Sequence, residues 1–105
     1  MPDTFYRVVK SNPPTERDFW SHQALGFPLL RAEDREIWTG ISVQATEQQA
    51  RQRAKIPGLG SYIAKLVVAD TSAIRVRRTT RRPGHHTLWG EPDELLAYAV
   101  CTIPV

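Results

Sequence analysis

An arginine cluster in the second half of the chain carries its most concentrated positive charge. Arginine guanidiniums stay protonated at any working pH and bind phosphate through paired hydrogen bonds, so the cluster predicts a site for phosphate or another anion. The alternative is a solvated basic strand and loop without a ligand. The cluster consists of five arginines within eight positions: Arg75, Arg77, Arg78, Arg81 and Arg82.

Two adjacent histidines and a tryptophan follow the cluster, between Gly84 and Gly90. His85 or His86 could act as a general acid or base, because the ordinary pKa of histidine is about 6.5. Adjacent side chains of an extended segment point to opposite sides, so the pair does not predict a shared metal ion, and we expect no metal site. In the alternative interpretation, one histidine bonds to the backbone while Trp89 packs into the core.

Carboxylates and a lone cation complete the set of candidates. The acidic residues of segment 91–94 precede the last predicted strand, where they could cap a helix or stabilise a developing cation. Arg7 stands among the apolar residues of a predicted first strand. Its guanidinium must therefore reach solvent, an internal carboxylate, or a bound phosphate or ribose.

Length and composition restrict the class of protein. A chain of 105 residues that is 41% hydrophobic predicts one domain with a small core. Because no apolar run approaches the roughly 18 residues of a membrane span and the first residues do not resemble a secretory signal, we expect no membrane association. A cytoplasmic location is the simpler expectation, and a secreted effector is the alternative. Cys101 lies in an apolar run, where we expect it to be buried.

Charge is divided unevenly between the two halves of the chain. Residues 1–52 carry 6 basic and 7 acidic side chains, whereas residues 53–105 carry 8 basic and 4 acidic ones. This asymmetry favours an anionic partner for the second half, either an acidic protein or a nucleic acid bound through Arg75–Arg82.

The elements that must position these residues follow from periodicity and from helix start and stop signals. We predict a single α+β domain over residues 1–105, with a mixed or mostly antiparallel sheet of about five strands and two main helices. Segment 81–90 is predicted as a loop, and segment 91–94 as a first helical turn. Strands are predicted at 5–9, 37–43, 61–69, 73–79 and 97–103, and helices at 15–25 and 47–55.

In the order of these parts the chain resembles the minimal ADP-ribosyltransferase fold, particularly its small bacterial toxin-like members. Phe5-Tyr6-Arg7-Val8-Val9 resembles the family's first strand, and Trp38-Thr39-Gly40-Ile41-Ser42 resembles its hydroxyl-bearing second motif. The acidic segment precedes a late strand, as the family's catalytic glutamate does. It reads Glu-Pro-Asp-Glu rather than Glu-x-Glu, so a non-catalytic member of the fold is an open alternative.

The resemblance implies a mono-ADP-ribosyltransferase that uses NAD⁺ and modifies a macromolecular target. It implies that Arg7 grips the cofactor's phosphates or ribose and that Ser42 or Thr39 supports the acidic residue. Glu94 would bind the nicotinamide ribose and stabilise an oxocarbenium-like transition state, although the resemblance does not decide among the three acidic residues. They are Glu91, Asp93 and Glu94, and the aromatic candidates for stacking on nicotinamide are Tyr6, Tyr62 and Trp89.

Two other functions fit the same residues. The first is an RNA-directed toxin or ribonuclease, in which His85 or His86 transfers protons, Glu94 assists and Arg82 with its neighbours binds the phosphate. The second is a non-enzymatic module that binds a nucleic acid or a protein through the basic strand.

Overall fold

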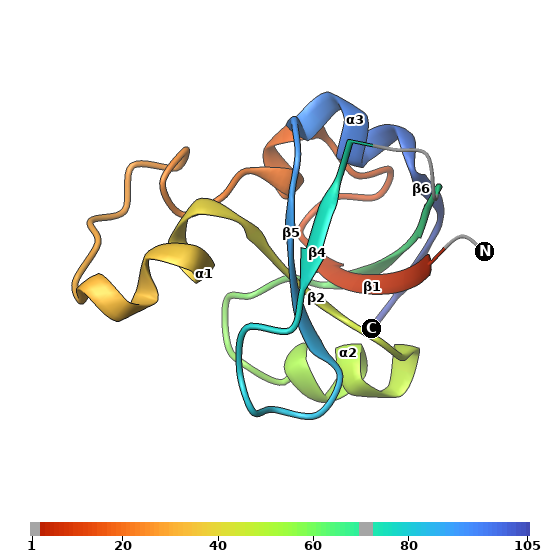
Figure 1. Cartoon of the computed structure of the whole chain (residues 1–105). Helices are drawn as coiled ribbons and strands as arrows, with labels where there is room; N and C mark the ends of the chain where they lie inside the picture. Colours follow the sequence, from red (N-terminus) through yellow and green to blue (C-terminus); the bar gives the residue numbers. More distant parts are fainter. Residues whose placement is uncertain (1–2, 70–72) are drawn as a thin grey trace.

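A six-stranded antiparallel sheet organises the chain, in the strand order β4-β5-β2-β1-β3-β6 (Figure 1). The computed structural model describes residues 3–69 and 73–105. The α+β class is confirmed, with one strand more than expected. The strands are β1 (Asp3–Val9), β2 (Ile41–Gln44), β3 (Tyr62–Val68), β4 (Arg75–Arg77), β5 (His85–Trp89) and β6 (Ala99–Pro104).

Short helices cover both faces of the sheet. In Figure 1, α3 lies on one side of the strands and α2 on the other. Buried Leu95 of α3 and Phe19 of η1 pack with the main core, whereas α2 contributes buried Ala50 to the opposite face. The helices are α1 (Arg35–Thr39), α2 (Glu47–Arg53) and α3 (Pro92–Ala97), and the 3₁₀ turns are η1 (Glu16–Phe19) and η2 (Ala32–Asp34).

The main core follows from strand alternation. Phe5 and Val9 of β1 point to the face that holds Leu66 of β3, which lies opposite Phe5 in the register. Alternation places Arg7 on that same face, between two core residues. The core face of β1 therefore carries one cation, and its guanidinium must find acceptors beside the core.

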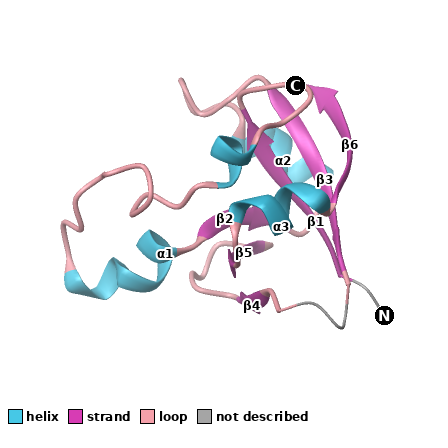
Figure 2. Ribbon diagram, turned by 90° about the horizontal axis from the view of Figure 1, so that it is seen from above, coloured by secondary structure: helices cyan, strands magenta, loops and turns pink. Residues whose placement is uncertain are grey.

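The sheet separates into two groups of strands between β1 and β2. These two strands pair in register at Tyr6 and Gln44, whereas β1 pairs with β3 over its whole length, from Asp3 to Val9. Figure 2 shows β1, β3 and β6 running together and β2, β5 and β4 forming the other group. Because β1 and β2 diverge beyond this contact, the side chains next to it can line a cleft.

Two predicted strands and one predicted helix differ from the structure. The strand predicted at 37–43 is wrong in its first half, because α1 continues to Thr39, whose hydroxyl donates to the carbonyl oxygens of Arg35 and Glu36. The helix predicted at 15–25 reduces to η1, since Asp18 caps this turn by accepting from the Thr15 amide. The strand predicted at 73–79 is confined to β4.

The prediction of a loop at 81–90 is also wrong in its second half, which forms β5 between β2 and β4. Its inward polar residues, His85 and Thr87, are buried because hydroxyl groups of neighbouring segments bond to them. Cys101, expected to be buried, is exposed. It lies on the edge strand β6 opposite Lys65, on a side that the core does not cover.

No helix in the described part of the chain is both long enough and apolar enough to cross a membrane.

Candidate functional site

A cleft of about 570 Å³ opens where β1 and β2 separate. Residues of both strands line it, together with η1, the end of α2 and the segment that follows η1. The volume lies within the usual range of ligand sites, roughly 300 to 1,000 Å³. The lining residues that matter for its chemistry are Tyr6, Arg7, Arg17, Trp20, Ser42 and Arg53.

Arg7 bridges the two walls of the cleft. Its Nε donates to the carbonyl oxygen of Asp18 (2.8 Å), and its Nη1 donates to the carbonyl oxygen of Ser42 (2.7 Å). Burial lowers the pKa of Arg7 to about 10, while the charge of Asp18 acts in the raising direction. The guanidinium therefore stays protonated at neutral pH and is held rigidly in the cleft.

Asp18 fixes the turn above Arg7. One carboxylate oxygen accepts from the amide of Lys10 (2.9 Å), and the other accepts from the amide of Thr15 (2.9 Å). These bonds hold η1 against the end of β1. Because both carboxylate oxygens are engaged by the backbone, Asp18 positions the turn and balances part of the charge of Arg7.

Further cations make the cleft electropositive. Lys10, Arg17 and Arg53 all line it. The guanidinium of Arg17 lies 5.1 Å from the centre of the Trp20 ring, in cation–π geometry. Burial, and then the charge of Arg82, lowers the pKa of Arg53. A bound anion would relieve this crowding of positive charge, so the arrangement is suited to phosphate.

His85 supports Ser42 from inside the sheet. Its Nε2 lies 3.1 Å from the Ser42 hydroxyl, and its Nδ1 lies 2.9 Å from the Thr80 hydroxyl. The residue is 2% exposed. Burial lowers the pKa of His85 to about 4, and the nearby charges of Arg82 and Arg53 act in the same direction. The imidazole is therefore neutral at pH 7 and positions Ser42.

This pKa predicts a pH-dependent loss of stability. In the unfolded chain His85 binds a proton below about pH 6.5, whereas in the folded protein it does so only below about pH 4. The contribution is complete above pH 6.5 and decreases as the pH falls, so the free energy of unfolding should be about 2 kcal/mol lower at pH 5 than at pH 7. Urea unfolding of the wild type and of His85→Gln measures it. In His85→Gln the free energy of unfolding should therefore fall less between pH 7 and pH 5 than in the wild type. An equal fall in both proteins would contradict the prediction.

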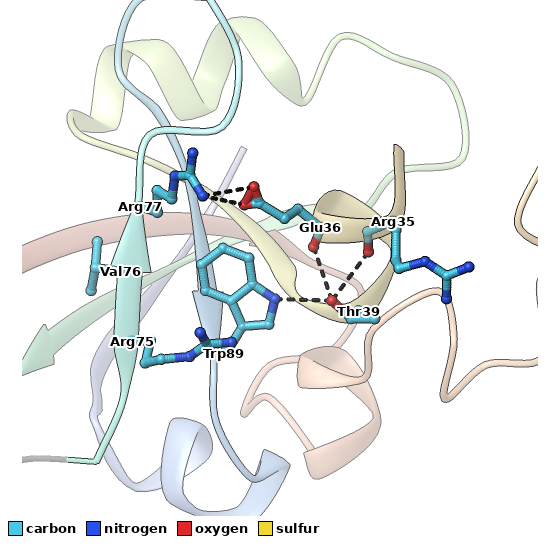
Figure 3. Close-up of a pocket in the computed structure, with 7 residues that line it drawn as sticks. All are labelled: Arg35, Glu36, Thr39, Arg75, Val76, Arg77 and Trp89. Carbon is cyan, nitrogen blue, oxygen red and sulfur yellow. Dashed lines mark hydrogen bonds and ion pairs between the residues drawn. The ribbon is translucent and has the colours of Figure 1, made fainter. Parts of the chain in front are cut away.

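A second hollow, a groove of about 670 Å³, lies beside α1, β4 and β5 (Figure 3). The indole nitrogen of Trp89 donates to the Thr39 hydroxyl (3.0 Å), and the guanidinium of Arg75 lies 4.9 Å from the centre of the Trp89 ring. Nη1 of Arg77 donates to both carboxylate oxygens of Glu36, at 2.9 and 2.8 Å. The groove is a different place from the cleft of Arg7 and Ser42.

The structure thus divides the residues that the sequence singled out. Tyr6, Arg7 and Ser42 meet at the cleft, whereas Thr39 and Trp89 belong to the groove. The arginine cluster is divided as well. Arg75 and Arg77 line the groove, while Arg78, Arg81 and Arg82 are exposed on the loop before β5.

Glu94 and His86 do not line the cleft. Glu94 lies on α3, where its carboxylate accepts from the Tyr98 hydroxyl at 3.5 Å. The His86 ring lies 5.4 Å from that of Phe5, and its Nδ1 donates to the carbonyl oxygen of Gly84 (3.0 Å). Of the expected meeting of Arg7, Ser42 and Glu94, the cleft brings together the first two.

Sequence reasoning missed Arg53 and Trp20. Arg53 follows buried Ala50 by three positions on α2, so helical spacing places the two side chains on neighbouring parts of one face. That spacing was an available signal for Arg53. Trp20 reaches the cleft through the end of η1, and its local sequence gives no such signal.

Comparisons with known protein families, with curated proteins and with solved structures find no match to this chain. Within residues 3–69 and 73–105, no group of three or more histidine, cysteine or acidic side chains could hold a metal ion.

Proposed function

We propose that the chain is an ADP-ribosyltransferase-like domain that binds NAD⁺ in the cleft between β1 and β2. The observation that carries the proposal is the meeting of Arg7 with Ser42, 35 positions later in the chain, at one cleft lined by cations. The resemblance of the first strand and of the second motif implies these two residues for the cofactor. The choice of NAD⁺ over other nucleotides rests on that resemblance.

The charges of the cleft support a pyrophosphate ligand. Arg7 of β1 and Arg53 at the end of α2 both line the cleft. Both side chains are partly buried, so phosphate oxygens bound in the cleft would form charge-assisted hydrogen bonds with them in a weakly screened environment. We assign Arg53 to the pyrophosphate together with Arg7.

Aromatic rings border the same space. Tyr6 and Trp20 line the cleft from β1 and from the end of η1. Flat rings of this kind offer stacking surfaces to an adenine or a nicotinamide ring. We therefore place one base of the dinucleotide against Tyr6 and the other against the face of Trp20 that Arg17 does not cover.

The transfer step rests on the resemblance. It needs a carboxylate that stabilises the oxocarbenium-like ribose as nicotinamide leaves, and Glu94 is the residue that the resemblance implies. Because Glu94 lies outside the cleft lining, binding and transfer should be measured separately. A macromolecule is the acceptor in this proposal, and a cytoplasmic location fits a free, exposed Cys101.

Calorimetric titration with NAD⁺ tests binding. Arg53→Gln should weaken NAD⁺ affinity about tenfold, because one charge-assisted phosphate contact is lost. Arg51→Gln is the matched control, since Arg51 lies on the same helix but pairs with Glu47 at 3.1 Å. Its affinity should equal that of the wild type.

Absence of heat at millimolar NAD⁺, or equal losses in the two variants, would contradict the proposed binding site. Release of nicotinamide, followed in the wild type and in Glu94→Gln, then tests transfer. Release that Glu94→Gln abolishes with NAD⁺ affinity retained supports a transferase. Binding without release leaves a cofactor-binding domain.

A further inference from the structure

The strand β4 ends the sheet on the side of the groove, next to β5. It has three residues, and all of them are exposed. Among residues 3–69 and 73–105, no strand pairs with the outer edge of β4, and exposed edges of this kind pair with strands of other chains. All three residues of β4 also line the groove, so the groove and this edge adjoin.

The side chains of β4 alternate in character. Arg75 and Arg77 lie opposite Trp89 and Thr87 in the register, and all three residues of β4 line the groove. Val76, which is 37% exposed, extends from the other side of the strand than the two arginines (Figure 3). Figure 3 shows the two guanidiniums extending from β4 on either side of the Trp89 ring. A strand added to this edge would meet a cation, an apolar residue and a second cation, in that order.

One of the two arginines of β4 can form a new ion pair with an acidic ligand. Nη1 of Arg77 already donates to both carboxylate oxygens of Glu36, so this pair is largely neutral. Arg75 lies over Trp89 and has no carboxylate within ion-pair distance among the described residues. A carboxylate opposite Arg75 would form a new pair, and one opposite Arg77 would compete with Glu36.

We propose that the β4 edge binds an extended acidic segment of a partner protein, with acidic side chains at two positions separated by one apolar residue. Opposite charges on directly facing residues stabilise paired strands, and like charges destabilise them. A second copy of β4 would place arginines near arginines. An acidic strand is the complementary partner.

The geometry of Trp89 disfavours RNA at this surface. Single-stranded nucleic acid is held by open aromatic faces as well as by charge. Arg75 covers one face of Trp89, and the indole N–H is already donated to Thr39. The peptide interpretation needs no open ring, because its contacts are backbone bonds and ion pairs.

Selection from a displayed library of random seven-residue peptides tests the proposal. The enriched peptides should carry Asp or Glu at positions i and i+2 around an apolar residue. A synthetic copy of the best peptide is then titrated against the protein. Arg75→Gln should weaken its binding about fivefold, and Arg51→Gln, away from the groove, should leave binding unchanged.

Glu36→Gln provides the sharper test. Removing this carboxylate frees Arg77 for the ligand, so the variant should bind the acidic peptide several times more tightly than the wild type. A Glu36–Arg77 pair with only a structural role would not strengthen binding when it is broken. Binding of the same peptide with its alternate amides N-methylated should be lost, since strand pairing needs those amides.

Four results would overturn the proposal. They are a failure to enrich any peptide, an enriched set without the acidic pattern, equal affinities of Arg75→Gln and Arg51→Gln, and an affinity of Glu36→Gln at or below that of the wild type. Tighter Arg75-dependent binding of a single-stranded RNA oligonucleotide, or sedimentation as a dimer that Arg75→Gln dissociates, would also overturn it in favour of another occupant. Because the groove is separate from the cleft, these results do not depend on NAD⁺ binding.

Discussion

Replacing Arg7 by methionine is expected to lower the free energy of unfolding by about 4 kcal/mol, since each abandoned acceptor costs roughly 2 kcal/mol. The acceptors are the carbonyl oxygens of Asp18 and Ser42. Methionine fills much of the same space but donates nothing, so both walls of the cleft lose their bridge. Urea unfolding followed by circular dichroism measures the change.

Arg7→Lys is the matched variant for charge. An ammonium keeps the positive charge but cannot donate in both directions with the planar geometry of a guanidinium. Its loss of stability should be about half that of Arg7→Met. Losses of less than about 1 kcal/mol in both variants would show that Arg7 does not bridge the two walls.

Gly40→Ala is expected to cost about 4 kcal/mol, through overpacking and the loss of one hydrogen bond. A Cβ at this position would collide with the Thr87 side chain and would lie 2.7 Å from the carbonyl oxygen of Leu88 and 2.9 Å from the indole nitrogen of Trp89. The strand β2 would have to move away from β5, which would disturb the bond from Trp89 to Thr39. Urea unfolding and the near-ultraviolet tryptophan signal report both effects.

Gly58→Ala is the control for Gly40→Ala, because it adds backbone strain without steric crowding. Gly58 has a φ of +78°, and a Cβ there would meet nothing within 4 Å. Its cost is the strain of a left-handed residue, about 1 kcal/mol. A cost of Gly40→Ala equal to or below that of Gly58→Ala would contradict the tight packing of β2 against β5.

The parts of the fold that the sequence predicts well are those with local signals. The side chain of Thr46 accepts from the amide of Gln49 (3.1 Å) and starts α2 where the capping pattern placed it. The alternation and β-branching of β1 and β3 likewise predict both strands. In contrast, β5 contains His85 and Thr87, whose burial depends on hydroxyl groups supplied by other segments. Partners that lie far away in the sequence cannot be predicted from a local pattern of residues.

The sequence likewise predicts some residues of the candidate site but not how they are arranged. Arg7 interrupts an apolar strand, so its guanidinium was expected to reach solvent, an internal carboxylate, or a bound phosphate or ribose. In the structure it donates to two backbone carbonyl oxygens. Thr39 and Ser42 lie on either side of Gly40 and Ile41 but line different hollows. Thr39 is the last residue of α1, and its hydroxyl donates to carbonyl oxygens of that helix. Only tertiary structure reveals that separation.

The NAD⁺ site between β1 and β2 is tested most directly by titrating the ¹⁵N-labelled protein with NAD⁺ and following its backbone amide resonances. Binding in the cleft predicts shifts concentrated at Tyr6 to Lys10, at Arg17 and at Ser42, with the amides of Arg75 to Arg77 unchanged. Shifts confined to β4 and the groove, or no shifts at millimolar NAD⁺, would contradict it.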